Sequence, residues 1–174
     1  MLIETGRLIV REFSPDDGND LHEILGDAET MKYCEPAYCF DQTQKFLEEF
    51  CIGRKGALAV VLKDSKKVIG YILFKPWDGS VYEIGWIFHK NYWRQGYAYE
   101  ACSALIDCGF QEWNIHKVVA ETIDGQKSVW LMEKLGMKRE GVQRSQTKDS
   151  DGNWADLYLY GLLREDNRSP AAEV

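Results

Sequence analysis

The feature that most constrains the fold is a strand, a loop and a long helix in direct succession. Residues 81–88 alternate in apolar character, which predicts a strand. In residues 98–110 small and apolar side chains recur at helical spacing and form one unbroken apolar stripe. The loop between them must therefore deliver the chain from a sheet directly into a helix N-terminus. One face of the predicted strand carries Ile84, Trp86 and Phe88, and the other carries Glu83, Gly85 and Ile87.

The loop itself, Trp93–Ala98, has the composition of an anion site. Free N–H groups and the helix dipole both favour negative charge at a helix N-terminus. Gly96 would let a ligand approach the backbone closely, and Arg94 adds a cation. A single glycine before a helix is more often a simple loop closure, so the loop alone does not identify a phosphate site.

The remaining pattern predicts further strands and helices around this unit. Their order, β-α-α-β-β-β-α-β-α-β-β, lacks the regular alternation of a doubly wound dinucleotide fold. The sequence predicts an α/β fold with a mixed central sheet of about seven strands and about four helices. We expect one domain over residues 1–165 and a flexible C-terminal tail over 166–174. The other expected strands cover 7–13, 57–62, 68–74, 117–122, 137–142 and 157–163, and the other helices begin near 14, 41 and 126.

Local signals suggest where several elements begin and end. Ser14 followed by Pro15 predicts a helix start, and Asp41 with Gln44 has the spacing of a capping box. The segment Pro76–Gly79 is expected to end a strand, and Gly136 to end the helix that starts near 126.

Charge narrows the possible partners. The 174 residues carry 21 Lys and Arg against 28 Asp and Glu, a net charge of −7. An acidic chain is unsuited to nucleic acid or an anionic membrane, and it suits a cationic acceptor such as an amine. Solubility is the more ordinary reason for such a charge.

The cysteines and the chain start point to a reducing compartment. The five cysteines are odd in number and form no Cys-x2-Cys pair, so we expect reduced thiols and no metal site. The first residues lack a basic and then apolar secretory pattern, and no segment is apolar over the length of a membrane span. A cytoplasmic protein is the expectation.

Several motifs that would name other enzymes do not occur in the sequence. Neither a P-loop nor a Gly-x-Gly-x-x-Gly fingerprint is found, so P-loop nucleotide hydrolysis and nicotinamide chemistry have no support. A Gly-x-Ser-x-Gly elbow and a His-Glu-x-x-His pair are likewise missing, so the serine hydrolase and zinc protease classes have no support either.

Five stretches in order resemble the GNAT superfamily of N-acetyltransferases. Within it they look closest to the branch containing the ribosomal-protein alanine and serine N-acetyltransferases. The resemblance spans residues 4 to about 163. The stretches are Glu4–Arg11, Glu83–Phe88, Tyr92–Ala101, Leu131–Gly141 and Trp154–Tyr158.

The resemblance implies acetyl-CoA as co-substrate, held where the fourth and fifth strands of a mostly antiparallel sheet splay apart. Backbone N–H groups from Arg94 to Ala98 would hold the pyrophosphate, and the backbone of Trp86 to Phe88 would pair with the pantetheine amides. The implied acetyl-CoA-binding set is Trp86, Ile87, Phe88, Trp93, Arg94, Gln95, Gly96, Tyr97, Ala98, Tyr99, Gln126 and Ser128.

One departure from the branch concerns the start of the helix near residue 126. The branch usually has Asn-x-x-Ser there, with the Asn near pantetheine, whereas this chain has Gly125 and then Ser128. Gln126 is the nearest amide that could replace the Asn. A lost hydrogen bond would weaken CoA binding by roughly 1 kcal/mol.

Amine acetylation by direct attack in a ternary complex needs a base and an acid. Glu83 is the candidate base and Ser128 the candidate acid at sulfur. The alternatives are an ordinary solvated strand carboxylate and a hydroxyl bonded to its own helix start. Leu131 and Met132 stand where many members of the superfamily have a tyrosine, and neither can donate a proton.

The sequence is compatible with several classes of amine acceptor. A protein N-terminal amine, a polyamine and a small amine drug or metabolite all fit, and a monomer and a homodimer are equally compatible. A non-catalytic acyl-CoA sensor on the same fold is the alternative function, and an interaction module that binds no CoA is a third. Aromatic and acidic residues that could line an acceptor cleft, or simply pack in the core, are Tyr33, Tyr38, Trp77 and Asp156.

Overall fold

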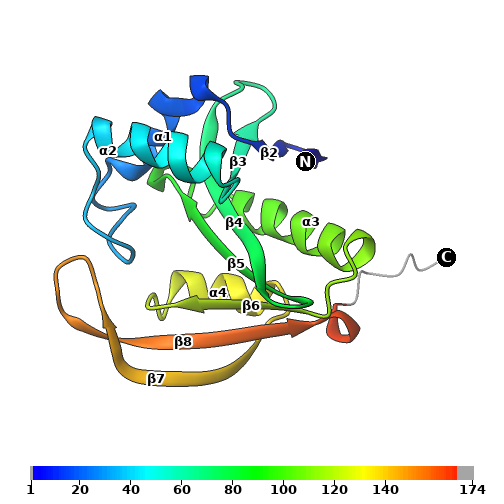
Figure 1. The fold of residues 1–174 in the computed structure, drawn as a ribbon. Coiled ribbons are helices and arrows are strands. Elements are labelled where there is room, and N and C mark those ends of the chain that lie inside the picture. Colours follow the sequence, from blue (N-terminus) through cyan, green and yellow to red (C-terminus); the bar gives the residue numbers. More distant parts are fainter. Residues whose placement is uncertain (1, 168–174) are drawn as a thin grey trace.

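The computed structural model describes residues 2–167, and all strands of this part of the chain belong to one sheet (Figure 1). The strands are β1 (Leu2–Glu4), β2 (Leu8–Glu12), β3 (Leu58–Leu62), β4 (Val68–Asp78), β5 (Val81–Phe88), β6 (Lys117–Thr122), β7 (Lys138–Lys148) and β8 (Trp154–Leu163). Their order is β1-β2-β3-β4-β5-β6-β8-β7, and only β5 and β6 are parallel among the described strands. The expected mixed and mostly antiparallel sheet is confirmed. The additional strand is β1, which is too short to leave a pattern.

Helices cover both faces of the sheet (Figure 1). The longer ones are α1 (Gly18–Leu25), α2 (Phe40–Lys45), the π-helix η2 (Phe46–Gly53), α3 (Tyr97–Glu112) and α4 (Lys127–Lys134); the short ones are η1 (Pro15–Asp17), η3 (Lys90–Tyr92) and η4 (Arg164–Asp166). One apolar core lies between the sheet and α3 and α4, and a second lies between the sheet and α1 and η2. No described helix combines the length and apolar character that a membrane crossing requires.

The predicted strand–loop–helix unit is confirmed at the centre of the fold. On β5, Ile84 and Phe88 are buried in the core under α3, while Ile87 packs against the opposite core. This alternation follows from the two-residue period of a strand. The helical stripe is also confirmed, because Ala101, Cys102, Leu105, Ile106, Gly109 and Phe110 are all buried.

The splay between the fourth and fifth predicted strands, now β5 and β6, is confirmed by their register. They pair only from Val81 with Lys117 to Glu83 with Val119. Beyond Glu83 the β6-facing edge of β5 has no strand partner among the described residues, although its other edge remains paired with β4 up to Phe88. A free strand edge therefore opens in the middle of the sheet.

Two boundary predictions were wrong. The capping box of the second helix lies two residues earlier than Asp41 and Gln44: Cys39 is the N-cap, and its N–H donates to Gln42 Oε1 at 2.8 Å. In addition, Pro76 does not end its strand, since β4 continues to Asp78. A shift in register between Pro76 and Asp78 forms a bulge, and a proline without an N–H is tolerated at such a site.

The last two strands are longer than their hydrophobic pattern suggests. Val142 pairs with Tyr158 inside the two predicted ranges, but the ladder continues outward to Lys148 opposite Trp154. The outer part is mostly exposed on β7, so it carries no apolar alternation. Gly136 has φ of +83°, in agreement with its predicted role at the end of α4.

The end of the chain falls partly outside the described residues. Asp166 closes η4, and Asn167 Nδ2 donates to Asp107 Oδ1 at 2.8 Å. Residues 168–174 of the expected tail are not among those described.

Candidate functional site

The start of α3 presents backbone N–H groups that have no acceptor within the described part of the chain. Gly96 is the N-cap, with φ of +81°, and no side chain caps the helix. Glu100 N–H donates to Gly96 O at 3.0 Å, whereas no described residue accepts a hydrogen bond from the N–H groups of residues 94–99. Unpaired donors at the positive end of a 16-residue helix form a site for an anion.

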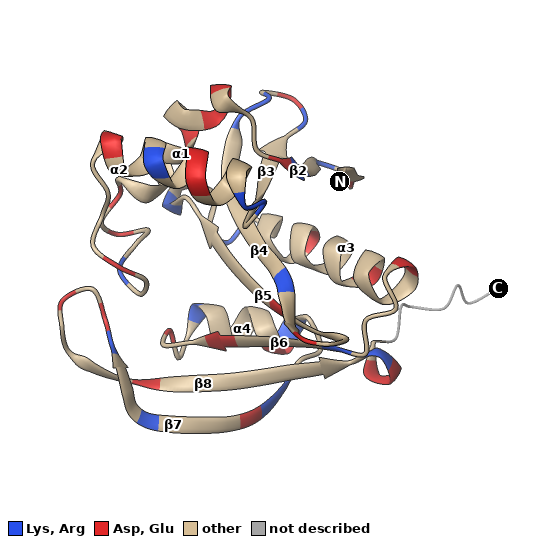
Figure 2. Ribbon diagram, in the orientation of Figure 1, with Lys and Arg blue, Asp and Glu red and all other residues tan. Residues whose placement is uncertain are grey.

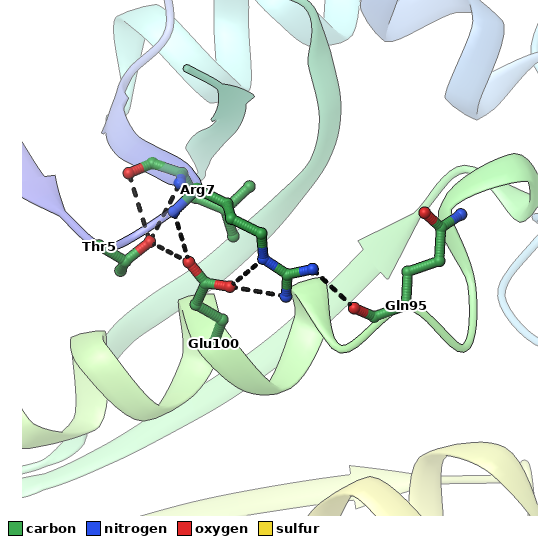
Figure 3. Close-up of polar contacts among 5 residues, drawn as sticks. Thr5, Arg7, Gln95 and Glu100 are labelled. Atoms are coloured by element: carbon green, nitrogen blue, oxygen red, sulfur yellow. Dashed lines mark hydrogen bonds and ion pairs between the residues drawn. The ribbon is translucent and has the colours of Figure 1, made fainter. Parts of the chain in front are cut away.

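The orientation of this loop is fixed by Arg7, which the sequence did not identify as a site residue (Figure 3). Its Nη1 donates to the Gln95 carbonyl oxygen at 3.0 Å, and its guanidinium lies 4.3 Å from the centroid of the Tyr97 ring. The described chain has no cis peptide bond. In a trans peptide the carbonyl and the following N–H point in opposite directions. The Gly96 N–H is therefore directed away from Arg7.

Arg7 is in turn held by Glu100 in the first turns of α3 (Figure 3). Glu100 Oε2 accepts from Arg7 Nε at 2.7 Å, and Oε1 accepts from Arg7 N at 2.8 Å and Thr5 Oγ1 at 2.5 Å. Burial alone would raise the pKa of Glu100, but the hydrogen bonds from Thr5 and Arg7 outweigh it and lower that pKa. These partners are more than ninety positions apart in the chain, so no local pattern could have revealed them.

Two of the predicted loop residues shape the loop from within. Trp93 Nε1 donates to the Phe88 carbonyl at 2.6 Å, and Gln95 Nε2 donates to the Asn91 carbonyl at 2.8 Å. Arg94 has φ of +58° and is exposed, and no hydrogen bond or ion pair ties its side chain to another described residue. Hydrogen bonds therefore hold the loop in one conformation, and the Arg94 side chain is a cation available to a ligand.

Glu83 faces away from α3 and is less exposed than a solvated strand carboxylate. Its side chain is 17% exposed, and Oε2 is buried at 3.0 Å from Nζ of Lys75, its neighbour on β4. The two form an ion pair without hydrogen-bond geometry. Nearby, Glu121 on β6 has its pKa raised, first by burial and then by the charge of Glu83, with Lys75 acting in the opposite direction. Two carboxylates and one ammonium therefore share this face of the sheet, beside the splay.

The other catalytic candidate, Ser128, lies in the first turn of α4. Its N–H donates to Asp124 Oδ2 at 3.3 Å, and the N–H groups of Gln126 and Lys127 donate to Asp124 Oδ1 at 3.0 Å each. Buried Asp124 therefore satisfies the first donors of α4, and this helix start is not a second phosphate site. The Ser128 hydroxyl has no hydrogen bond to a described residue, so it is not occupied by its own helix.

The structure explains why glycine stands at residue 125. A Cβ atom there would lie 3.1 Å from the hydroxyl oxygen of Tyr158 and 3.3 Å from two of its ring carbons. A side chain at this position would crowd the ring, which would have to shift by a few tenths of an ångström to admit it. Tyr158, on β8 beside Thr122, fills the space and places a hydroxyl with no described hydrogen-bond partner at the same point.

The four candidate acceptor residues are not brought together by direct contact. Tyr38 packs edge-on to Phe46 beside the α1–η2 core, and burial raises its pKa to about 12. Trp77 is 62% exposed in the β4 bulge, and Tyr33 is 41% exposed in the segment between α1 and α2. Asp156 accepts from the backbone N–H of Ser145 at 2.8 Å and stabilises a β7 bulge.

The β7–β8 hairpin tip contacts the connection between α1 and α2. Ser150, at the tip of the β7–β8 hairpin, donates from its hydroxyl to the Lys32 carbonyl at 2.7 Å. The hairpin tip and the α1–α2 connection lie side by side there (Figure 1). Tyr33 is therefore adjacent to the hairpin tip, on the side of the sheet that bears Glu83.

Four of the five cysteine thiols have pKa shifts that do not suit covalent chemistry. Burial raises the pKa of Cys34 to about 11 and that of Cys51 to about 12, and it also raises the pKa of Cys102 and Cys108. A nucleophilic cysteine needs the opposite shift. Within residues 2–167, no group of three or more His, Cys, Asp or Glu side chains is placed to hold a metal ion.

A hollow of the described surface lies away from these residues. It has a volume of about 520 Å³ and contains none of the predicted site residues. It lies at the opposite end of α3 from Gly96 and is lined by Leu2, Ile3, Cys108, Glu112 and Trp113.

Known proteins match this chain over most of its length. Residues 7–138 match the family described as acetyltransferase (GNAT) domain. An uncharacterized N-acetyltransferase of Bacillus subtilis (strain 168), YnaD, is 34% identical over 95% of this chain and 99% of its own. A GNAT-family acetyltransferase from Bacillus anthracis superposes with a TM-score of 0.87 at 32% identity, over 95% of this chain and 99% of that one.

A more distant likeness concerns the fold alone. RimL, described as a ribosomal L7/L12 α-N-protein acetyltransferase in complex with coenzyme A, superposes with a TM-score of 0.80 at 16% identity. The match covers 94% of this chain and 98% of that one.

Proposed function

Since the chain belongs to the GNAT acetyltransferases and is therefore an acetyl-CoA-dependent N-acetyltransferase, we propose that it acetylates a primary amine by direct attack within a ternary complex. The observation that carries this proposal is the set of unpartnered N–H groups at residues 94–99, placed directly after the free edge of β5. Together they offer donors for a pyrophosphate and a strand edge for an amide-bearing arm.

On the donor side, the N–H groups from Arg94 to Ala98 hold the pyrophosphate, with the Arg94 side chain as an additional cation. The backbone of Trp86 to Phe88 pairs with the pantetheine amides as an added strand would. Tyr97, Tyr99 and Gln126 border these positions. Tyr158 replaces the asparagine of the branch in shape and offers its hydroxyl at the same place.

On the acceptor side, Glu83 receives a proton from the incoming ammonium, directly or through water. The neutral amine nitrogen then forms a bond to the thioester carbonyl carbon, and the carbon–sulfur bond breaks. The Ser128 hydroxyl is the candidate proton donor to the leaving thiolate, and the proton that the attacking nitrogen gives up on becoming an amide restores that hydroxyl. Lys75 holds the Glu83 carboxylate in place through their 3.0 Å contact.

The raised pKa values of the cysteine thiols support this direct route over a covalent acetyl-enzyme. The carboxylates of Glu83 and Glu121 suit a cationic acceptor. Protein N-terminal amines, polyamines and small amines all meet that requirement, and a non-catalytic acyl-CoA sensor remains the alternative function.

A CoA-release assay tests the proposal with three acceptor classes: peptides starting with Ala or Ser, spermidine, and an aminoglycoside. We expect turnover with one class, and we expect Glu83→Gln to reduce kcat by roughly a hundredfold at unchanged acetyl-CoA affinity. Glu48→Gln, which alters an exposed carboxylate on η2, is the matched control. CoA binding with no turnover on any amine would favour the sensor. The absence of a thermal shift at millimolar CoA would exclude both functions.

A further inference from the structure

Three residues of α4 lie on one side of the helix, next to the anion loop. Lys127, Trp130 and Lys134 follow at intervals of three and four, which places them on a common face. Lys127 Nζ lies 3.9 Å from the centroid of the Trp93 ring, inside the loop. Lys134 Nζ lies 4.7 Å from the Tyr99 ring and 4.9 Å from the Trp130 ring. We call Lys127, Trp130 and Lys134 the α4 strip.

The α4 strip is exposed and positively charged on an acidic protein. Trp130 is 61% exposed, and both lysines are exposed. Neither lysine forms an ion pair with a described carboxylate, and the neighbouring Glu133 is turned toward β8, where it accepts from Tyr160 Oη at 3.1 Å. All charges on α3 are acidic (Figure 2). Arg7 beside its start is already paired with Glu100, so among the described residues the cations without a carboxylate partner there are Arg94 of the loop and the two lysines of the α4 strip.

This chemistry matches one part of the co-substrate. An exposed indole face stacks on a purine, and ammonium groups pair with a phosphate monoester. Acetyl-CoA carries both features at its nucleotide end, joined to the pyrophosphate. Because the strip begins at Lys127 over Trp93, a nucleotide whose pyrophosphate occupies residues 94–98 has the strip within reach.

We propose that the α4 strip binds the adenosine 3′-phosphate end of acetyl-CoA, with Trp130 stacking on the adenine and Lys127 and Lys134 holding the 3′-phosphate. This inference rests on the proposed function and extends it to residues that have no role in it. The backbone of α4 contributes nothing to this site, since Asp124 already occupies its first donors. The recognition is carried by side chains alone, which makes it separable by mutation.

Isothermal titration with CoA and dephospho-CoA separates the two contacts without any need for turnover. The intact protein is expected to bind CoA roughly tenfold more tightly than dephospho-CoA, because charge-assisted bonds to the 3′-phosphate are lost. Lys134→Met and Lys127→Met should each reduce that ratio while leaving the affinity for dephospho-CoA unchanged. Trp130→Ala should weaken both ligands equally, by roughly tenfold.

Lys138→Met is the matched control, since Lys138 is an exposed lysine on β7 paired with Asp166. It removes the same charge and should retain the full CoA to dephospho-CoA ratio. The inference is overturned if the strip lysine variants keep the ratio of the intact protein, or if Trp130→Ala binds both ligands normally. A protein that binds neither ligand would instead overturn the proposed function, so the two failures are distinguishable.

Discussion

The Arg7 guanidinium donates to the Gln95 carbonyl at 3.0 Å across a separation of 88 residues (Figure 3). This bond turns the following Gly96 N–H away from Arg7, within the loop that we propose holds the pyrophosphate. Arg7→Gln, which cannot span the distance, is expected to weaken acetyl-CoA binding about fivefold, the worth of one hydrogen bond. The acceptor KM should not change. Titration with CoA measures the first quantity and steady-state kinetics the second.

The control for Arg7 is Thr5→Val. It removes the hydroxyl that donates to Glu100 Oε1 but leaves the Arg7–Gln95 bond in place. We expect a lower melting temperature at normal CoA affinity. Equal losses of CoA affinity in both variants would show that Arg7 acts only by anchoring the N-terminal segment.

Gly96→Ala should affect stability and binding together. Gly96 has φ of +81°, where a Cβ costs about 1 kcal/mol of unfolding free energy. Gly152, in the β7–β8 turn, has φ of +86° and open space around it, so Gly152→Ala carries a similar strain far from the loop. Urea denaturation should show comparable destabilisation, whereas only Gly96→Ala should lose CoA affinity. Normal binding by Gly96→Ala would argue against close approach of a ligand at this residue.

Gly125→Ala is expected to destabilise the protein through its contact with Tyr158. The added Cβ would lie 3.1 Å from the tyrosine hydroxyl, which is closer than ordinary packing allows. Tyr158→Phe removes that hydroxyl, so the double variant should lose less stability than the sum of the single variants. A double-mutant cycle by chemical denaturation should give a coupling of about 0.5 kcal/mol or more. Strictly additive losses of stability would mean that contact with Tyr158 is not what requires glycine at residue 125.

The raised pKa of Glu121 predicts a pH-dependent effect on stability. A carboxylate whose folded pKa exceeds its unfolded value favours the folded state while protonated, and this contribution is lost as pH rises through the folded pKa. Glu121→Gln should therefore raise the melting temperature at pH 7.5 but have little effect near pH 4. Glu48→Gln serves as the control for the change in net charge. A Glu121→Gln melting temperature that does not depend on pH in this way would contradict the shift.

The sequence by itself determined the central unit of the fold. The period of the 81–88 strand, the apolar stripe from 98 to 110 and Gly96 between them are local signals, and each leads to one structure. Local sequence patterns predicted less of the structure where the chain is polar. The outer halves of β7 and β8 and the capping box of α2 were misjudged because exposed residues leave backbone pairing undecided.

Only the tertiary structure decided how the site is assembled. Arg7 reaches Gln95, Lys75 pairs with Glu83, and Tyr158 occupies the space beside Gly125. In each case the partners come from different strands or helices, and their distance depends on sheet register and helix packing rather than on spacing in the chain. The hydrophobic periodicity of the sequence indicates which face of a helix or strand is buried, but it does not indicate which distant residue will contact that face.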